Sequence, residues 1–366
     1  MKRILLTSTA LVAFAGAAAA EGHTSITNAL SAKLGYNSEN NPGEAGENGF
    51  YWEGNLKTTA TATLDNGLTA GAYFEITIDG DDATSSNDFG KVLSSSDFVV
   101  SLTSETAGLY YGDTGTAANR HWTSAGDMEA DGFTSGTDSA VLRGDVMFAG
   151  VDASVSYVVD DAADSVEQLS VGAKGSFGAF GFSVGYQEES DYVDTNGDFN
   201  GDEITAVSVS GSFAGADVTV GYADNATDGL TSTGIQVAYP IGPVTATAYY
   251  VSEDSDAGDV DDNLGLTLAY ASGPVSVTAK VRDEQGRNEY NVEGTYDVGN
   301  GLEVLAGVLN ENEGDDADYY VGGRYDLGGG ANVLFAYAAD EDGDQGDEIG
   351  VPELDPGVTV EVSFAF

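Results

Sequence analysis

The chain has 366 residues, of which 61 are acidic and 12 are basic, and its formal net charge is −49. Such a charge repels the phosphates of nucleic acid and attracts cations, so it argues against nucleic acid as a partner. No cysteine is present, so burial and backbone pairing must stabilise the fold without disulfides.

Residues 1–20 have the layout of a secretory signal peptide. Lys2 and Arg3 precede an apolar run, and small residues ending in Ala-x-Ala lie before Glu21. The apolar run is too short and wrongly flanked to be a membrane helix. We therefore predict export of a mature chain, residues 21–366, which forms one domain because no Pro-rich or Gly/Ser-rich linker divides it.

The mature chain consists of segments that alternate in polarity, each about ten residues long and followed by turn residues. In residues 51–64 the two faces are Trp52, Leu56, Ala60, Ala62 and Leu64 against Glu53, Asn55, Lys57, Thr59, Thr61 and Thr63. No apolar run is long enough for a spanning helix, which excludes a helical membrane protein. We count about twenty such segments, which predicts an all-β protein.

From Ser139 onward, short connections alternate with long acidic ones. The short ones are turns rich in glycine and proline: residues 178–179, 214–216, 240–243, 272–274, 299–301 and 328–330. The long ones are residues 160–164, 188–203, 224–228, 253–262, 311–318 and 340–355. Short turns at one rim and longer loops at the other are typical of a bacterial outer-membrane β-barrel whose short turns face the periplasm.

Aromatic residues lie at both ends of the predicted apolar face. Near the acidic loops they are Tyr157, Tyr186, Tyr222, Tyr250 and Tyr337; near the short turns they are Phe177, Phe213, Tyr239, Tyr270, Tyr296 and Tyr325. Two such rings are expected where side chains meet both headgroup layers of a bilayer. A soluble β-sandwich also uses strand tyrosines, but it has no reason to place them at both ends of one outward face.

The two ends of the chain are predicted to close the barrel. A sheet crosses hydrocarbon only if its last strand pairs with its first, because unpaired backbone amides are costly there. Residues 24–36 and 357–366 both alternate in polarity, so we expect them to pair as the seam.

Residues 114–138 interrupt the alternation for longer than a turn requires. Their charged and aromatic members are Arg120, His121, Trp122, Asp127, Glu129, Asp131, Phe133 and Asp138. A loop of this length in a compact fold is usually functional or disordered. The mixture of side chains favours a loop that folds inward and lines a wet passage; the alternative is a disordered surface loop.

Together these features resemble a Gram-negative general diffusion porin of the alphaproteobacterial, Rhodobacter type, over the whole mature chain. SAKLGYNSE from Ser31 is similar to that family's first strand, and LYYGDT from Leu109 is similar to the strand before its infolded third loop. The C-terminal Phe364 and Phe366 resemble its assembly signal.

The resemblance implies a closed antiparallel transmembrane β-barrel in the outer membrane, usually of sixteen strands, with an inward-folded constriction loop. It also implies a homotrimer and contact with the barrel assembly machinery during biogenesis. Our count of about twenty segments departs from sixteen, although both numbers are even and allowed.

In the resembled family, acids on the infolded loop face bases on the barrel wall. For the constriction loop we predict Asp113, Arg120, His121, Asp127, Glu129, Asp131 and Asp138. For the lumen wall we predict Lys33, Lys57, Arg143, Asp145, Lys280, Arg282 and Arg324. Because acids outnumber bases, the passage should enrich cations. The alternative is that single wall charges are scattered and have no role in a constriction.

One acidic loop carries oxygen-bearing side chains at alternate positions, with glycines between them: Asp194, Asn196, Asp198, Asn200 and Asp202. The run resembles the start of an EF-type Ca2+ loop but lacks the flanking helices and the glutamate at the twelfth position. One hypothesis is a calcium site. The other is a solvated acidic loop that divalent ions bridge to lipopolysaccharide phosphates. The predicted passage itself requires no cofactor.

The leading functional hypothesis is passive transport through a water-filled, cation-preferring pore for ions and small hydrophilic solutes, embedded in outer-membrane lipid. The second is a non-conducting barrel that acts as an adhesin or structural anchor. A β-solenoid is disfavoured because the aromatic positions have no short fixed period. An enzyme is not predicted. His23 lies beside the predicted cleavage site, and His121 has no serine or carboxylate at a spacing that indicates a triad.

Overall fold

The computed structural model describes residues 24–38, 49–79, 92–94, 97–136, 140–159, 166–192, 199–310, 317–341 and 349–366. The predicted signal peptide lies outside these residues. Within them, no helix has the length and apolar character needed to cross a membrane.

The described chain is almost entirely β-structure, in 21 strands. They are β1 (Thr24–Asn37), β2 (Phe50–Thr63), β3 (Thr69–Asp79), β4 (Val92–Ser94), β5 (Phe98–Thr103), β6 (Ala107–Gly112), β7 (Ala140–Phe148), β8 (Val151–Val159), β9 (Val166–Phe177), β10 (Phe180–Gln187), β11 (Ile204–Phe213), β12 (Ala216–Asn225), β13 (Leu230–Ile241), β14 (Val244–Ser255), β15 (Asn263–Ser272), β16 (Val275–Glu284), β17 (Arg287–Gly299), β18 (Leu302–Asn310), β19 (Asp318–Gly328), β20 (Ala331–Ala339) and β21 (Gly357–Ala365). Two short helical segments lie between β6 and β7: α2 (Ala117–His121) and the 3₁₀ helix η1 (Glu129–Asp131). The all-β prediction is confirmed.

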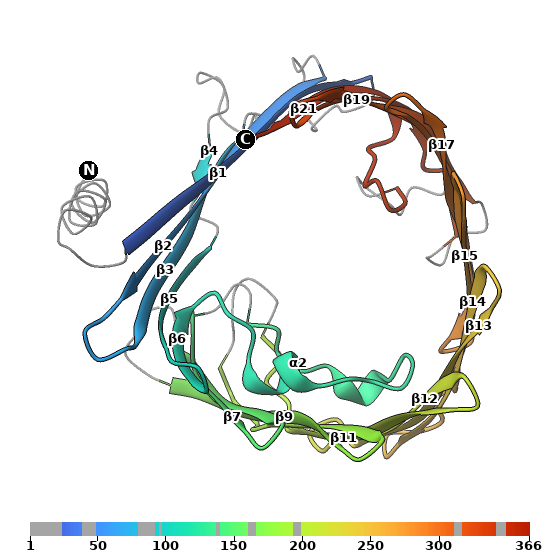
Figure 1. Ribbon diagram of the computed structural model, residues 1–366. Coiled ribbons are helices and arrows are strands. Elements are labelled where there is room, and N and C mark those ends of the chain that lie inside the picture. Colours follow the sequence, from blue (N-terminus) through green and yellow to red (C-terminus); the bar gives the residue numbers. More distant parts are fainter. Residues whose placement is uncertain are drawn as a thin grey trace.

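The strands form one closed antiparallel barrel (Figure 1). β1 pairs with β21, which places Lys33 opposite Ser363 and Tyr36 opposite Val360. Because β4 and β5 both pair with β3, the 21 strands occupy twenty positions around the wall. The count of about twenty from the sequence pattern is confirmed, and the sixteen implied by resemblance is wrong for this chain.

The outer face of the wall is apolar because alternate residues of each strand point away from the interior. On β15, Leu264, Leu266 and Leu268 are 48%, 39% and 41% exposed, whereas Asn263 and Gly265 are buried on the inner face. A soluble monomer rarely exposes so continuous an apolar band, and a membrane barrel presents one to lipid. The predicted apolar stripe is therefore confirmed, and two sheets stacked over an oily middle are excluded.

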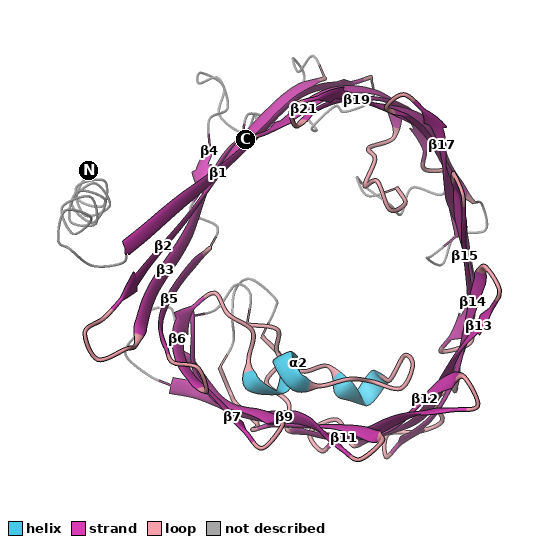
Figure 2. Cartoon of the chain, in the orientation of Figure 1, coloured by secondary structure: helices cyan, strands magenta, loops and turns pink. Residues whose placement is uncertain are grey.

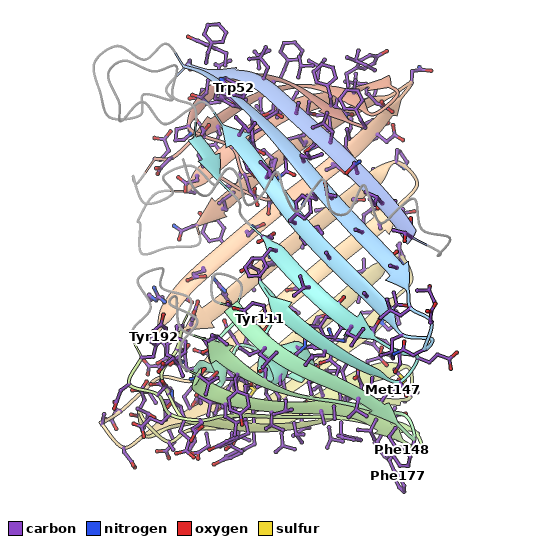
Figure 3. The ribbon with its side chains drawn as sticks, turned by 90° about the vertical axis from the view of Figure 1, so that its left-hand side faces the viewer. Trp52, Tyr111, Met147, Phe148, Phe177 and Tyr192 are labelled. Carbon is purple, nitrogen blue, oxygen red and sulfur yellow. The ribbon has the colours of Figure 1, made fainter. Side chains whose placement is uncertain are left out.

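Short turns close one end of the barrel, and bulky rings precede them. Ala149 and Gly150 have φ values of 52° and 83°, the geometry of a two-residue turn that matches the twist of its strands. Figure 3 shows Phe148 and Phe177 at this end and Tyr192 at the opposite end. Of the other predicted rim residues, Tyr157, Phe213, Tyr222, Tyr239, Tyr250, Tyr270, Tyr296, Tyr325 and Tyr337 are exposed and Tyr186 is half-buried.

Two segments fold into the interior and carry the apolar cores. The inner loop, residues 113–136, follows β6, and its predicted inward fold is confirmed. The second inner loop, residues 349–355, precedes β21 and packs on inward residues of β18, β19 and β20. The prediction that residues 340–355 form an outer acidic loop is wrong for this described part, because Ile349 and Leu354 are buried against the wall.

Candidate permeation pathway

The inner loop lies along one side of the barrel interior (Figure 2). It leaves the wall after β6 at Gly112, whose φ of 126° favours glycine. Helix α2 then contacts β8, β9 and β10, and η1 contacts β11, β12 and β13. The loop therefore narrows the interior from one side.

Serines at inward positions of four strands hold the backbone of the inner loop. Helix α2 has no side-chain N-cap, so its first amides need acceptors from elsewhere. The wall supplies them as hydroxyl oxygens. The serine and amide pairs are Ser156 with Ala117 and Ser170 with Ala118, both at 2.8 Å, Ser183 with Thr123 at 3.1 Å, and Ser232 with Ala130 at 2.9 Å.

Glycines at two inward positions let the loop backbone approach the wall. A Cβ on Gly172 of β9 would lie 2.0 Å from the carbonyl oxygen of Ala117. A Cβ on Gly234 of β13 would lie 2.3 Å from the carbonyl oxygen of Ala125. Since no side chain fits at either distance, glycine is required at both places for the loop to dock.

An apolar patch fastens the far end of the inner loop. Ile204, Ala206, Ala223 and Val251 occupy inward positions of β11, β12 and β14 and are buried. They pack against Ala118, Ala125, Met128, Ala130 and Phe133 of the loop. Apolar residues at inward positions break the polar interior expected of a water-filled barrel. That break is the signal in the sequence that locates the docking surface.

His121 faces the wall and not the passage. Its side chain is fully buried, and its Nε2 lies 2.7 Å from the hydroxyl of Ser154. The Ser154 hydroxyl donates to Asp145 at 2.7 Å, and the Nε of Arg143 donates to the same carboxylate oxygen at 2.9 Å. Burial lowers the pKa of His121, so the ring is neutral. This network anchors α2.

Arg143 extends the anchor to the start of the inner loop. Its Nη1 donates to the Thr114 hydroxyl at 2.6 Å and to the carbonyl oxygen of Gly115. Arg120 of α2 lies 3.7 Å from the other oxygen of Asp145. The predicted Arg143 and Asp145 are therefore brought together with Arg120 and His121 at one end of the loop.

The three central acids of the inner loop lie at its other end. Asp127 is 3.6 Å from Nη1 of Arg282 on β16. Glu129 accepts a hydrogen bond from Nδ2 of Asn263 at 2.9 Å, and Asp131 accepts one from the indole of Trp122 at 2.8 Å.

Burial raises the pKa values of two of these acids, Asp131 and Asp127. It raises the pKa of Asp131 to about 6; the hydrogen bond from Trp122 opposes the rise, and the charges of Asp127 and Glu129 add to it. Burial also raises the pKa of Asp127, with Glu284 adding and Arg282 opposing. The passage therefore contains a carboxyl group that titrates near neutral pH.

Four predicted wall bases each face an acid on the next strand, directly opposite in the ladder. The pairs are Lys33 with Glu53 at 3.0 Å, Lys57 with Glu75 at 2.9 Å, Arg324 with Glu303 at 3.7 Å, and Arg282 with Glu289. Lys280 forms no ion pair within the described residues. Acids on the neighbouring strands therefore offset the charge of most of the predicted wall bases. The resemblance had implied that these bases face the acids of the inner loop instead.

Comparison with known proteins identifies the family. The model of the Gram-negative porin family matches residues 7–345. This chain is a member of the Gram-negative porin family. The family is one of outer-membrane channels, which points away from an enzyme. Two engineered mutants of Rh. blastica porin each match with a TM-score of 0.50 and 18% identity, over 74% of this chain and 98% of theirs. A search of curated protein sequences finds no significant match.

The remaining predicted residues of this porin lie at its edges. Asp113 accepts a hydrogen bond from the amide of Phe98 at 2.5 Å, so it secures the start of the inner loop to β5. Asp138 lies outside the described residues. Phe366 donates its amide to Leu30 at 2.8 Å and accepts the amide of Leu30 at 3.2 Å, and its ring stacks near that of Phe364. The C-terminus therefore ends the seam.

Two of the five calcium candidates, Asn200 and Asp202, lie in the described residues, and Asn200 binds the inner loop. Asp194, Asn196 and Asp198 lie outside the described residues. The Nδ2 of Asn200 donates to the carbonyl oxygen of Gly132 at 2.7 Å, and Asp202 accepts from Nδ2 of Asn225 at 2.8 Å. These two side chains serve different partners and do not converge. Across the described ranges, no group of three or more acids or histidines is placed to hold a metal ion, and calcium binding stays a prediction.

Two glutamine side chains of this porin that were not predicted from the sequence bind the end of the inner loop. Gln187 accepts the amide of Thr134 at 2.8 Å, and Gln168 accepts its hydroxyl at 2.9 Å. Both glutamines also donate to the carbonyl oxygen of Asn200. They are fully or almost fully buried at inward positions of β9 and β10. A glutamine between small inward residues is the signal that a backbone segment covers it.

Proposed function

We propose that this porin forms a water-filled passage that prefers cations and carries ions and small hydrophilic solutes by passive diffusion. The observation that supports it best is the exposure of charged side chains that point into the barrel. Lys57 and Arg324 are 51% and 48% exposed, although their strands place them on the inner face. An interior filled with packed side chains would bury them.

Cation preference is supported by the charge balance of the inner loop. Residues 113–136 contain four acids and Arg120 as their single base, a net charge of 1 − 4 = −3. On the wall, bases are offset by the acids directly opposite them. The unbalanced acids of the loop therefore set the sign of the field in the passage.

Planar-bilayer recording tests the proposal. The refolded chain should give stable ohmic steps, and in a salt gradient its reversal potential should have the sign of a cation-preferring pore. The competing hypothesis, an adhesin or structural anchor, predicts a folded barrel that inserts without steps. A reversal potential of the anion sign would remove the cation preference and leave the pore.

The cation preference should fall as the pH is lowered from about 7.5 to about 5. The raised pKa of Asp131, about 6, lies inside this range, so the group loses its charge there. Burial lowers the pKa of His121, which opposes protonation of its ring as the pH falls. Because the pKa of Asp131 is raised in the folded state, protonation also relieves the cost of burying its charge, so stability rises as pH falls through about 6. The Asp131→Asn variant should show a flatter dependence of reversal potential on pH, and an unchanged slope would contradict the assignment.

We infer that the C-terminal Phe366 supports assembly in the outer membrane. Deleting it removes both backbone hydrogen bonds to Leu30, so the amount of folded barrel in outer membranes should fall about tenfold or more. Phe366→Ala keeps the backbone and removes the ring. A loss on deletion alone assigns the effect to seam pairing, and a loss with both variants assigns it to the ring. Normal levels of the deleted chain would refute the role.

We infer a homotrimer from the height of the wall at β5 and β6. Their ladder has five residue pairs, Val99 with Gly112 to Thr103 with Gly108, which is about 17 Å along a strand and less once tilted. The apolar band of an outer-membrane barrel is about 25 Å tall, so the wall at β5 and β6 is too short to form the whole band. A neighbouring copy of the chain packed beside these strands would supply the missing apolar surface. In this cysteine-free chain, Val100→Cys on the outer face of β5 should give covalent trimers with a three-armed maleimide, which bonds one thiol from each protomer, and Leu266→Cys on β15 should not.

A further inference from the structure

The second inner loop is held in a defined place on the wall. Ile349 and Leu354 form a β-bridge, and the turn between them uses Gly350 and Glu353 with φ values of 70° and 52°. Both bridge residues are buried against inward apolar residues of β18, β19 and β20, namely Leu305, Leu309, Tyr320, Ala336 and Ala338. Figure 1 shows this loop inside the ring near β17, apart from α2.

Glu293 of β17 fixes the tip of this loop. One of its carboxylate oxygens accepts the hydroxyl of Tyr320 at 2.6 Å and the amide of Val351 at 2.7 Å. The other oxygen accepts from Nδ2 of Asn291 at 2.8 Å. A Cβ on Gly350 would lie 2.3 Å from the Tyr320 ring, so the loop sits as close to the wall as its backbone allows.

Between this loop and the wall lies a recess of about 440 Å3. The loop supplies the roof, with Glu353 and Asp355, and the wall supplies Lys33, Arg324 and Glu361. The volume is in the range of sites that hold small molecules. The recess opens to the interior, where water and solutes pass in the proposed function.

The wall of the recess carries opposite charges in one cross-strand row. Arg324 on β19 is opposite Leu334 on β20, and Leu334 is opposite Glu361 on β21. Two strand spacings, about 10 Å, therefore separate the backbones of the guanidinium and the carboxylate. This separation leaves room for a solute between two charged poles.

Glu361 is held by a tyrosine that reaches across β1. The hydroxyl of Tyr51 on β2 donates to Glu361 at 2.9 Å. Gly35 on β1 lies between them, and a Cβ there would be 2.0 Å from the Tyr51 ring. Glycine at this position therefore leaves room for the Tyr51 ring to cross β1. The hydrogen bond from Tyr51 holds the Glu361 carboxylate in place without a solute.

The chemistry of the recess selects against singly charged solutes. Its two bases and three acids give 2 − 3 = −1. An anion meets three carboxylates, and a simple cation meets the guanidinium of Arg324, because the ammonium of Lys33 already pairs with Glu53. Arg324 touches Glu303 at 3.7 Å through one nitrogen, so most of its five N–H donors remain for a ligand. A solute with one ammonium and one carboxylate matches both poles at once.

We propose that this recess is a binding station for small zwitterions, the chemical class of free amino acids and short peptides, on their way through the passage. The carboxylate of the solute faces Arg324, and its ammonium faces Glu361 and the roof acids. The inference rests on the proposed pore function. It adds a second element of selectivity, on a part of the wall that the inner loop does not cover.

Solute flux into liposomes tests the station. The probes are glycylglycine, a zwitterion, and N-acetylglycinamide, a neutral solute of similar size, and the readout is the ratio of their fluxes. The wild-type ratio should exceed one. Arg324→Gln and Glu353→Gln should each lower it about threefold, the effect of losing a charge-assisted hydrogen bond to a half-exposed group. Arg287→Gln makes the same chemical change as Arg324→Gln, in an arginine outside the recess, and should leave the ratio unchanged.

Potassium chloride conductance, recorded for every variant, separates the possible failures. A wild-type chain without conductance overturns the pore function, and the station falls with it. A conducting wild-type chain whose flux ratio equals that of both pole variants overturns the station alone. A fall with Arg324→Gln and none with Glu353→Gln overturns the zwitterion class, because one pole is then enough.

Discussion

Replacing Gly172 with valine should detach α2 from the wall, lower the single-channel conductance and lower the stability of the barrel. The Cβ would lie 2.0 Å from the carbonyl oxygen of Ala117 and 3.1 Å from the Cβ of His121. The wall strand is fixed by its ladders on both sides, so the inner loop is the part that yields. Moving away from β9 takes it into the passage. Overpacking of this kind costs about 1–3 kcal/mol.

Gly144→Val is the matched control for this prediction. Gly144 lies in β7 on the outer face, where a Cβ meets nothing within 4 Å. The chemical change and the strand context are the same, and only the contact with the inner loop differs. Conductance and thermal unfolding should therefore change with Gly172→Val and stay near wild type with Gly144→Val. Equal values for the two variants would show that close docking of the loop does not shape the passage.

The barrel itself was predictable because its solvent dictates a simple pattern. Hydrocarbon requires every outward residue to be apolar and every backbone group to be paired, so Leu264, Leu266 and Leu268 signal their face from spacing alone. The strand number followed from counting such segments and was more reliable than the number typical of the resembled family. Every strand obeys the same rule of apolar outward residues, so each segment of the sequence indicates the fold separately from the others.

Some side-chain pairing was also implicit in the sequence. The turn after β2 has Leu64 and Leu68 hydrogen-bonded to each other, and counting back from it places Lys57 opposite Glu75. A hairpin's turn therefore sets which base meets which acid. The register set by this turn therefore already implies that Lys57 pairs with Glu75 across the ladder and not with the inner loop alone.

The second inner loop could not be placed from its own composition. Acidic neighbours made residues 340–355 look like an outer loop, and the two buried residues, Ile349 and Leu354, are few among them. The signal lay in the strand against which this loop packs. On β18, Leu305 and Leu309 are apolar although they occupy positions that face a water-filled interior. An apolar inward residue on a barrel strand predicts a cover, but the strand does not say which loop supplies it.

Neutralising the three central acids of the inner loop should reduce cation preference by about fourfold. In water a unit charge at about 7 Å is worth about 0.6 kcal/mol, and screening at 0.1 M salt halves this, so each acid contributes about 1.6-fold. Asp127→Asn also removes the carboxylate nearest Nη1 of Arg282, which exposes more positive charge to the passage. The measurement is the reversal potential of the triple variant Asp127→Asn, Glu129→Gln and Asp131→Asn in a salt gradient.

The matched control removes the same amount of charge from the end of β14 and the connection that follows it. Asp254, Asp256 and Asp259 are exposed there, and replacing them with asparagine changes the net charge of the chain as much as the loop variant does. If total charge set the preference, both triple variants would shift the reversal potential equally. If the field of the inner loop sets it, only the loop variant shifts it strongly, because fields from exposed charges decay within about 10 Å at this ionic strength. An unchanged potential in the loop variant would mean that ions pass where these acids do not reach.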